Sequence, residues 1–190
     1  MNPTSPRVKL TYEDFVLFPD DGKRHELIDG EHFVTASPNL RHQRVVGSLY
    51  AAVSSWLEAH PVGEVLLSPF DVVLSDVDVV EPDLLYISNE RKRTVLTPKH
   101  AIGAPDLVVE VASPSTRARD ETIKRRLFER SGVSEYWVVD PDLETVRVYV
   151  PVDGVFGRPT ELAKERADGL STGLLPGFEL ALSRIFRDDV

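Results

Sequence analysis

Helix-like and strand-like stretches of hydrophobic residues follow one another along the chain. From about residue 39 to residue 59, apolar side chains recur every three or four positions, which predicts an amphipathic helix that ends before Pro61. A second long helix is expected after Ser113-Pro114-Ser115. It is expected to end near Ser131, because Gly132 holds the usual helix-ending position.

The strand-like segments begin with a hairpin. Residues 24–28 and 31–35 flank Asp29-Gly30, a dipeptide that favours a type I′ turn, so we expect an N-terminal β-hairpin. Two further β-rich runs, residues 64–74 and 77–87, are expected to lie next to each other as antiparallel strands. Near-continuous apolar runs predict buried strands at residues 107–111 and 136–139, and an alternating run predicts a strand at residues 146–150. The chain after Pro151 is rich in turn residues.

Length and composition narrow the possibilities. At 190 residues, with 42% hydrophobic and 28% charged residues, the chain is expected to form a single α/β domain over residues 1–190. Because there is no cysteine, disulfides and a thiolate nucleophile are excluded, and a hard cation held by oxygen or imidazole is favoured over zinc. The N-terminal residues lack a signal-peptide pattern, and no apolar run reaches the roughly 18 residues that span a bilayer, so we expect a cytoplasmic protein without membrane contact.

The net charge of -9 argues against a surface that coats nucleic acid everywhere. Positive charge is nevertheless clustered at residues 91–93 and 117–130. The first of these clusters could hold a phosphate backbone or form an ordinary solvated loop. The local distribution of charge is therefore more informative about phosphate binding than the net charge.

Two acids lie in β-type apolar runs. Glu110 interrupts Leu107-Val108-Val109, and a buried carboxylate is costly unless it is paired, protonated or bound to a cation. An arginine partner alone would satisfy it. Asp83 follows Pro82 in the neighbouring run, and two carboxylates brought together persist when a divalent cation lies between them. This pattern is typical of phosphodiester cleavage.

Lys124 is the third candidate. Ile123, Leu127 and Phe128 mark the buried side of its predicted helix, and Lys124 borders that side. A lysine that faces the sheet can position the attacking water or stabilise developing negative charge. The alternative is a lysine that reaches solvent and pairs with Glu121 or Asp120.

Three other polar residues have a structural alternative. Glu26 is a candidate acid or an exposed hairpin residue paired with Arg24. His42, one turn before Val45, is more often a satisfied core residue than a general base in such a position. Asp106 is expected to be a strand-entry residue. No phosphate-binding glycine loop, Ser-His-Asp order or His-Glu-x-x-His motif is present.

A family resemblance joins these residues. Several segments of the chain resemble the Uma-type restriction endonucleases of the PD-(D/E)XK nuclease superfamily, and the resemblance extends from about Tyr12 to Val150. They are Pro82-Asp83, Glu110 in Leu-Val-Val-Glu-Val, Ser113-Pro114-Ser115-Thr116, Lys124, the segment 132–141 (Gly-Val-Ser-Glu-Tyr-Trp-Val-Val-Asp-Pro), the segment 25–31 (His-Glu-Leu-Ile-Asp-Gly-Glu), and Ser37-Pro38 with His42.

The resemblance implies a restriction-endonuclease-like α/β core: a mixed central sheet, four-stranded at its centre, flanked by helices. It also implies a Mg²⁺ site on Asp83 and Glu110, with Mn²⁺ as a substitute, and hydrolysis of DNA. Glu26 resembles an additional acid that completes or orients the metal shell. The superfamily pattern expects lysine at the position of Ala112, and Lys124 on the next helix is the matching residue in this branch.

The sequence therefore predicts a Mg²⁺-dependent DNA endonuclease in which Asp83, Glu110, Lys124 and Glu26 form the site. The alternative is a nuclease fold kept as a non-catalytic module that binds nucleic acid or a protein, which the acidic net charge and Ala112 favour. By analogy with small nucleases, a homodimer is expected to form through the late strands.

Overall fold

The computed structural model describes residues 8–187. After the short helix α1 (Tyr12–Phe15), strands β1 (Arg24–Ile28) and β2 (Glu31–Thr35) form the predicted hairpin. Asp29 and Gly30 both have positive φ, 53° and 73°, as a type I′ turn requires. The turn chemistry of two residues therefore sets the register of the hairpin.

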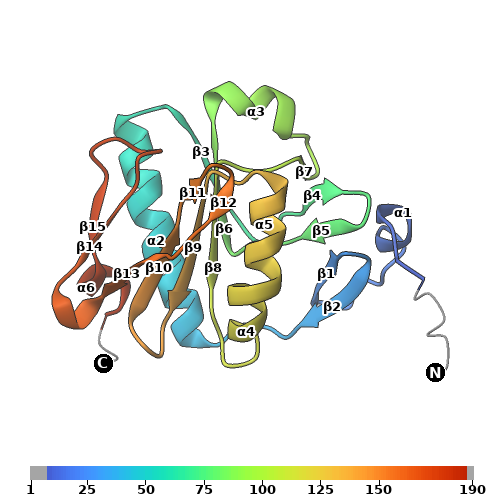
Figure 1. Cartoon of the computed structure of the whole chain (residues 1–190), viewed down its shortest axis with the longest axis horizontal. Helices are drawn as coiled ribbons and strands as arrows, with labels where there is room; N and C mark the ends of the chain where they lie inside the picture. The colour runs from blue at the N-terminus through green and yellow to red at the C-terminus, as the bar shows by residue number, and fades with distance from the viewer. Residues whose placement is uncertain (1–7, 188–190) are drawn as a thin grey trace.

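A six-stranded sheet forms the centre of the molecule (Figure 1). Strands β8 and β9 run parallel, and every other neighbouring pair in this sheet is antiparallel, so the sheet is mixed, as expected. In spatial order its strands are β13 (Thr160–Ala163), β10 (Thr145–Tyr149), β9 (Glu135–Asp140), β8 (Leu107–Val111), β6 (Leu84–Ser88) and β3 (Gly63–Leu67).

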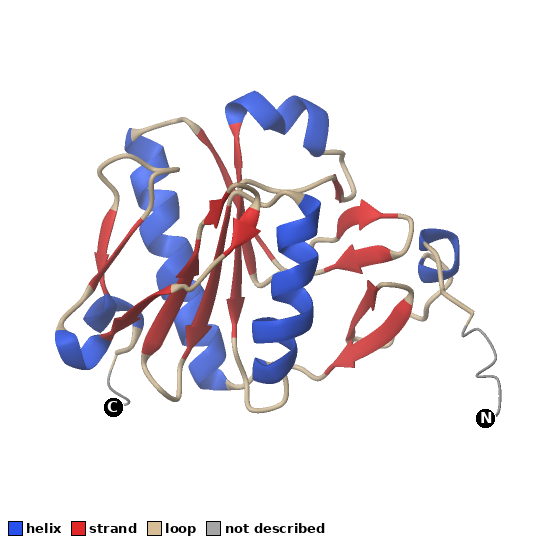
Figure 2. Cartoon of the chain, in the orientation of Figure 1, coloured by secondary structure: helices blue, strands red, loops and turns tan. Residues whose placement is uncertain are grey.

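Helices cover both faces of this sheet (Figure 2). The long helix α2 (Leu40–Ala59) packs on one face. A continuous helical segment covers the other face and consists of α4 (Arg117–Arg119), a π-helical turn (Asp120–Lys124) and α5 (Arg125–Ser131). Gly132 ends it with φ 80°, as predicted. Because side chains alternate along a strand, consecutive residues of β8 face different helices.

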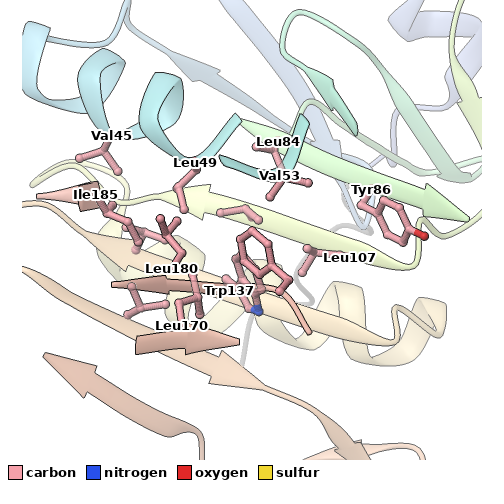
Figure 3. Packing of buried hydrophobic residues seen from close by; sticks show 14 of the residues in the cluster. Val45, Leu49, Val53, Leu84, Tyr86, Leu107, Trp137, Leu170, Leu180 and Ile185 are labelled. Atoms are coloured by element: carbon pink, nitrogen blue, oxygen red, sulfur yellow. The ribbon is translucent and has the colours of Figure 1, made fainter. Parts of the chain in front are cut away.

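The core on the α2 face contains more buried residues than the core on the other face, and Figure 3 shows part of it. Leu49 and Val53 of the helix pack against Trp137 of β9, and the C-terminal part of the chain adds Leu180 and Ile185 to the same cluster. This apolar packing accounts for the helical periodicity of residues 39–59. It also fixes which face of each central strand points away from α2.

The two β-rich runs predicted at residues 64–74 and 77–87 do not pair along their whole length. Each run crosses from one sheet to another: β3 pairs with β6, whereas β4 (Val72–Ser75) pairs with β5 (Asp78–Val80) in a second, five-stranded sheet. That second sheet contains the hairpin in the order β2-β1-β5-β4-β7, with β7 at Ala101–Ile102. Pro82, which lacks an amide hydrogen, lies at one crossing point.

Several elements were not predicted. Residues 88–103, expected to be a polar connection, contain helix α3 (Asn89–Val95) and strand β7. The turn-rich tail forms β13 at the edge of the central sheet and two ribbons. The remaining tail elements are β11 (Pro151–Val152), β12 (Val155–Phe156), the 3₁₀ turn Lys164–Arg166, β14 (Gly169–Ser171), β15 (Glu179–Ala181) and α6 (Leu182–Ile185). Apart from α3, which has seven residues, these elements are only two to four residues long, too short for a periodic signal.

Candidate active site

The strand register brings the two predicted acids together. Strand β6 pairs antiparallel with β8 so that Leu84 lies opposite Val109, and the next position along places Asp83 beside Glu110. Glu110 lies on the face turned away from α2, because its neighbours Val109 and Val111 belong to the core on the α2 face. Each of the two acids is only 3% exposed. Opposite residues of an antiparallel pair have Cβ atoms about 4.5–5.5 Å apart. The sheet thus holds two carboxylates side by side in a buried setting.

Three donors hold the carboxylate of Asp83. Arg24 Nη1 lies 2.9 Å from Oδ1, while the Val111 amide nitrogen and His42 Nε2 lie 2.8 Å and 3.2 Å from Oδ2. Burial alone would raise the pKa of Asp83, but the contacts with His42 and Arg24 outweigh it and lower the pKa to about 2. Asp83 is therefore ionised at neutral pH.

Lys124 links the other two predicted acids. Its Nζ lies 2.8 Å from Glu110 Oε1 and 2.7 Å from Glu26 Oε1, and the whole residue is only 1% exposed. Burial alone would lower the pKa of Lys124, but Glu110 and Glu26 raise it above its usual value. The alternative of a lysine reaching solvent is wrong, because the ammonium is buried between Glu110 and Glu26, and Glu121 pairs with Arg147 instead.

Glu26 comes to the site from the hairpin sheet. It has no exposed surface, and besides Lys124 its Oε1 accepts a hydrogen bond of 3.1 Å from the Glu81 amide. The exposed pairing with Arg24 considered above is therefore wrong, since Arg24 extends to Asp83. The site forms where the two sheets meet, and each sheet contributes acids.

The helix that carries Lys124 is wider than a regular α-helix at this point. Its π-helical turn begins at Asp120, which is also buried, and single π turns are frequent at functional sites. Ile123, expected on the buried side, is 41% exposed. The buried stripe is centred on Lys124, Leu127 and Phe128, so a charged residue occupies an interior position that hydrophobicity alone would assign to the isoleucine.

A cavity of about 270 Å³ opens over these residues. Its walls come from the segment that precedes and starts α2, from the loop after β8, and from the start of the helix that carries Lys124. The residues that line it include Arg24, Ser37, Asn39, Arg41, His42, Asp83, Glu110, Ser113, Thr116, Arg119, Asp120 and Lys124.

Three of these lining residues have contacts or buried polar atoms in the site that the sequence did not indicate. Arg24 pairs with Asp83, and His42 contacts Asp83 rather than serving only as a core residue, while its Nδ1 is buried without a partner. Asp120 has no hydrogen-bond partner for Oδ1. His42 and Asp120 each lie one turn from residues of an apolar stripe, which was the only signal available for them.

The basic cluster at residues 91–93 lies elsewhere. It belongs to α3, which follows the end of β6 farthest from Asp83 (Figure 1). Arg91 pairs with Asp106 and Lys92 pairs with Glu64, so much of its charge is already used within the chain. Asp106 also accepts the Ser88 amide at 2.7 Å, consistent with its expected role at the entry to β8.

The balance of acidic and basic groups around the pocket indicates whether a cation would fit there. Burial raises the pKa of Glu110 well above its usual range despite Lys124, and the nearby Asp83, Asp120 and Glu26 add to the rise. Glu26 Oε2 and Asp120 Oδ1 are buried without a hydrogen-bond partner, and Arg119 Nη2 lies 3.6 Å from Glu26 Oε2, close enough for an ion pair but beyond hydrogen-bond distance. The site is therefore short of positive charge, and the pair Asp83 and Glu110 matches the one or two carboxylates by which Mg²⁺ is held.

The donor set is limited to that pair. Within residues 8–187, no group of three or more His, Asp or Glu side chains is arranged to hold a metal ion. Lys124 separates Glu26 from Glu110, since its ammonium contacts both. Water and substrate oxygens would therefore complete the coordination of a bound Mg²⁺.

The family model Uma2, described as "Putative restriction endonuclease", matches residues 12–183. The chain belongs to the Uma2 family. This result confirms the resemblance identified in the sequence and extends it beyond Val150 to Ser183, within α6. The comparison with curated proteins gives no match.

One solved structure agrees with the Uma2 assignment at the level of fold. A crystal structure from Anabaena variabilis, described as a "putative nuclease belonging to DUF820", is 19% identical, covers 93% of this chain and 97% of its own, and has a TM-score of 0.79. This match confirms the restriction-endonuclease-like α/β fold. The type IIG restriction endonuclease BpuSI is 16% identical over 62% of this chain and 13% of its own, with a TM-score of 0.37, which is too low to carry an argument.

No helix in the described part of this Uma2 protein is long and apolar enough to cross a membrane. The cytoplasmic location, the homodimer and the DNA substrate stay predictions. The late strands do offer an edge to a partner, but that edge is β13 rather than β10.

Proposed function

We propose that this protein is a Mg²⁺-dependent endonuclease that hydrolyses DNA phosphodiester bonds. One observation carries the proposal: Asp83, Glu110 and Lys124 line one pocket, and the buried ammonium of Lys124 joins Glu110 to Glu26 behind it. A network of this kind costs stability, because burying charges is expensive. Its cost is explained if the charges act on a substrate.

Each residue of the network has a distinct role in the proposal. Asp83 and Glu110 would hold Mg²⁺, which when bound supplies a Lewis acid for the phosphate and lowers the pKa of a coordinated water. Arg24 and the Val111 amide fix the orientation of Asp83. Glu26 holds Lys124 from the far side and orients the ammonium toward Glu110.

Lys124 would act as a fixed positive charge. Because two carboxylates raise its pKa above the usual value, it keeps its proton and does not serve as a general base. An ammonium that is already oriented and shielded from water stabilises developing negative charge on the phosphate at little reorganisation cost. The helix-borne position replaces the lysine that the superfamily pattern expects at Ala112.

The experiment compares metal binding and DNA cleavage in matched variants. Mg²⁺ and Mn²⁺ are titrated by calorimetry into the wild type, Asp83→Asn and Glu110→Gln, and the same samples are incubated with supercoiled plasmid. Glu135→Gln is the control, because Glu135 is also buried on a central strand but bonds to Trp137 and Thr172 outside the pocket. We expect binding and nicking in the wild type and in the control, and neither in the two site variants.

The non-catalytic alternative makes the opposite prediction. Asp83 already has Arg24 and His42 as partners, and this favours the non-catalytic alternative, because a carboxylate whose charge is compensated has less need of a metal. A well-folded wild type that binds neither ion and leaves the plasmid intact would contradict the nuclease proposal. Retained plasmid binding in a gel-shift assay would then support a nucleic-acid-binding module.

A further inference from the structure

Tyr136 lies directly beneath the helix that carries Lys124. It belongs to β9, where it pairs with Val108 two residues before Glu110 on the neighbouring strand. The residue has no exposed surface, and its ring packs against Phe128 of α5 at 4.9 Å between ring centroids and against Tyr149 at 5.9 Å. Its aromatic body is therefore part of the core between the sheet and this helix.

The hydroxyl of Tyr136 leaves this apolar contact and reaches the helix backbone. It donates a hydrogen bond of 3.0 Å to the carbonyl oxygen of Asp120, the first residue of the π-helical turn. The same carbonyl accepts the amide of Arg125, five residues further along, which is the bond that defines a π turn. In a regular α-helix this carbonyl would accept the amide of Lys124 instead.

The two ends of this turn perform different tasks. At one end Tyr136 ties the Asp120 carbonyl to the strand next to the one that carries Glu110. At the other end Lys124 extends to Glu110 and Glu26 with distances of 2.8 Å and 2.7 Å. The hydroxyl thus joins the helix to the sheet about one helical turn from Lys124. A shift of the helix relative to the sheet at this point would change the distances from the Lys124 ammonium to Glu110 and Glu26.

We propose that Tyr136 is a positioning residue that acts through the π-helical turn to keep Lys124 aligned with the carboxylates. Its kinetic consequence rests on the proposed nuclease function, whereas its structural consequence does not. If Tyr136 only filled space, phenylalanine would replace it without effect on Lys124, because the two rings have the same shape. The hydroxyl is the single atom on which the proposal depends.

The test compares Tyr136→Phe with Tyr86→Phe. Tyr86 is a matched control, because it is another buried tyrosine of the central sheet whose hydroxyl donates to a backbone carbonyl, that of Val62, at 3.2 Å. Losing one hydrogen bond should lower the melting temperature of both variants by about 2–4 °C. Stability alone therefore does not separate the two tyrosines.

The decisive measurement is the side-chain ammonium signal of Lys124 in ¹⁵N-lysine-labelled protein. The chain has only six lysines, and Lys124 is the buried one among those in the described residues, so its ammonium exchanges slowly with water and is assigned by its loss in Lys124→Arg. We expect the signal to be unchanged in Tyr86→Phe and shifted or broadened in Tyr136→Phe. An identical signal in all three proteins would overturn the proposal.

Plasmid nicking provides the second readout. In Tyr136→Phe we expect kcat to fall by about 10- to 100-fold with KM unchanged, since sub-ångström to ångström misplacement of a charged group has effects of this size. Tyr86→Phe is expected to keep the wild-type kcat. Equal kcat in both variants would also overturn the positioning role. If the wild type itself does not nick DNA, the nuclease proposal fails and the ammonium signal alone decides the role of Tyr136.

Discussion

Replacing Lys124 by methionine should destabilise the protein strongly and in a pH-dependent way. Methionine has a similar length but no charge, so Glu110 and Glu26 lose the ammonium that contacts each of them. Removing one partner of a buried ion pair costs about 3–5 kcal/mol, because the remaining charge has no compensation. For a chain of this size, that loss corresponds to a decrease in melting temperature of roughly 6–20 °C.

The pH dependence follows from the pKa of Glu110. Burial already raises this pKa well above its usual value, and Lys124 is the main group that opposes the rise. In Lys124→Met the folded state therefore retains a proton on Glu110 over a wider pH range than the unfolded state does. Stability of the variant falls as pH rises from about 4.5 through the folded-state pKa, and each further pKa unit is worth about 1.4 kcal/mol.

Urea unfolding at pH 5 and pH 8, in the presence of a chelator, measures this effect. We expect Lys124→Met to lose more stability relative to wild type at pH 8 than at pH 5. Lys92→Met is the control, because Lys92 forms an exposed pair with Glu64 that is worth at most about 1 kcal/mol. If Lys124→Met were as stable as Lys92→Met at both pH values, the inference that Lys124 neutralises buried carboxylates would be wrong.

Two further predictions concern groups around the site. Burial raises the pKa of Glu81 to about 7 despite Arg24. The stabilisation from protonated Glu81 is therefore full below pH 4.5 and is lost as pH rises through 7. In urea unfolding, the stability of Glu81→Gln should depend less on pH than that of wild type. Gly30→Ala should cost at least 1–2 kcal/mol, roughly the penalty for positive φ, plus a clash, because its Cβ would lie 2.5 Å from Lys9 Cβ. Gly22→Ala, with the same φ of 73° and no atom within 4 Å, should show only the backbone penalty, and equal unfolding midpoints would contradict the clash.

The sequence alone determined the elements whose signals are local. The Asp29-Gly30 turn, the apolar stripe of α2 and the glycine that ends α5 all depend on interactions within a few residues, and the structure contains each of them. The acids at positions 83 and 110 were visible for a related reason. A charged residue within an apolar strand stands out whatever the rest of the chain does.

Tertiary structure decided which charges meet. Nothing local in the sequence indicates that Arg24 would pair with Asp83, which is 59 residues away, or that Glu26 would be buried against Lys124. Both contacts exist because the chain crosses between two sheets at Pro82, and the hairpin sheet then lies against the site. Strand pairings between distant segments depend on the packing of the whole chain, so periodicity within one segment cannot predict them.

The helix of Lys124 illustrates the same division within a single element. Its start, its end and the placement of Lys124 beside the buried side followed from the sequence, but the exposure of Ile123 and the nearly complete burial of Lys124 did not. A prediction based on hydrophobicity places lysine at the surface, because moving a charged group out of water is costly. Only the folded chain supplies the carboxylates of Glu26 and Glu110, which reverse that preference by compensating the buried ammonium.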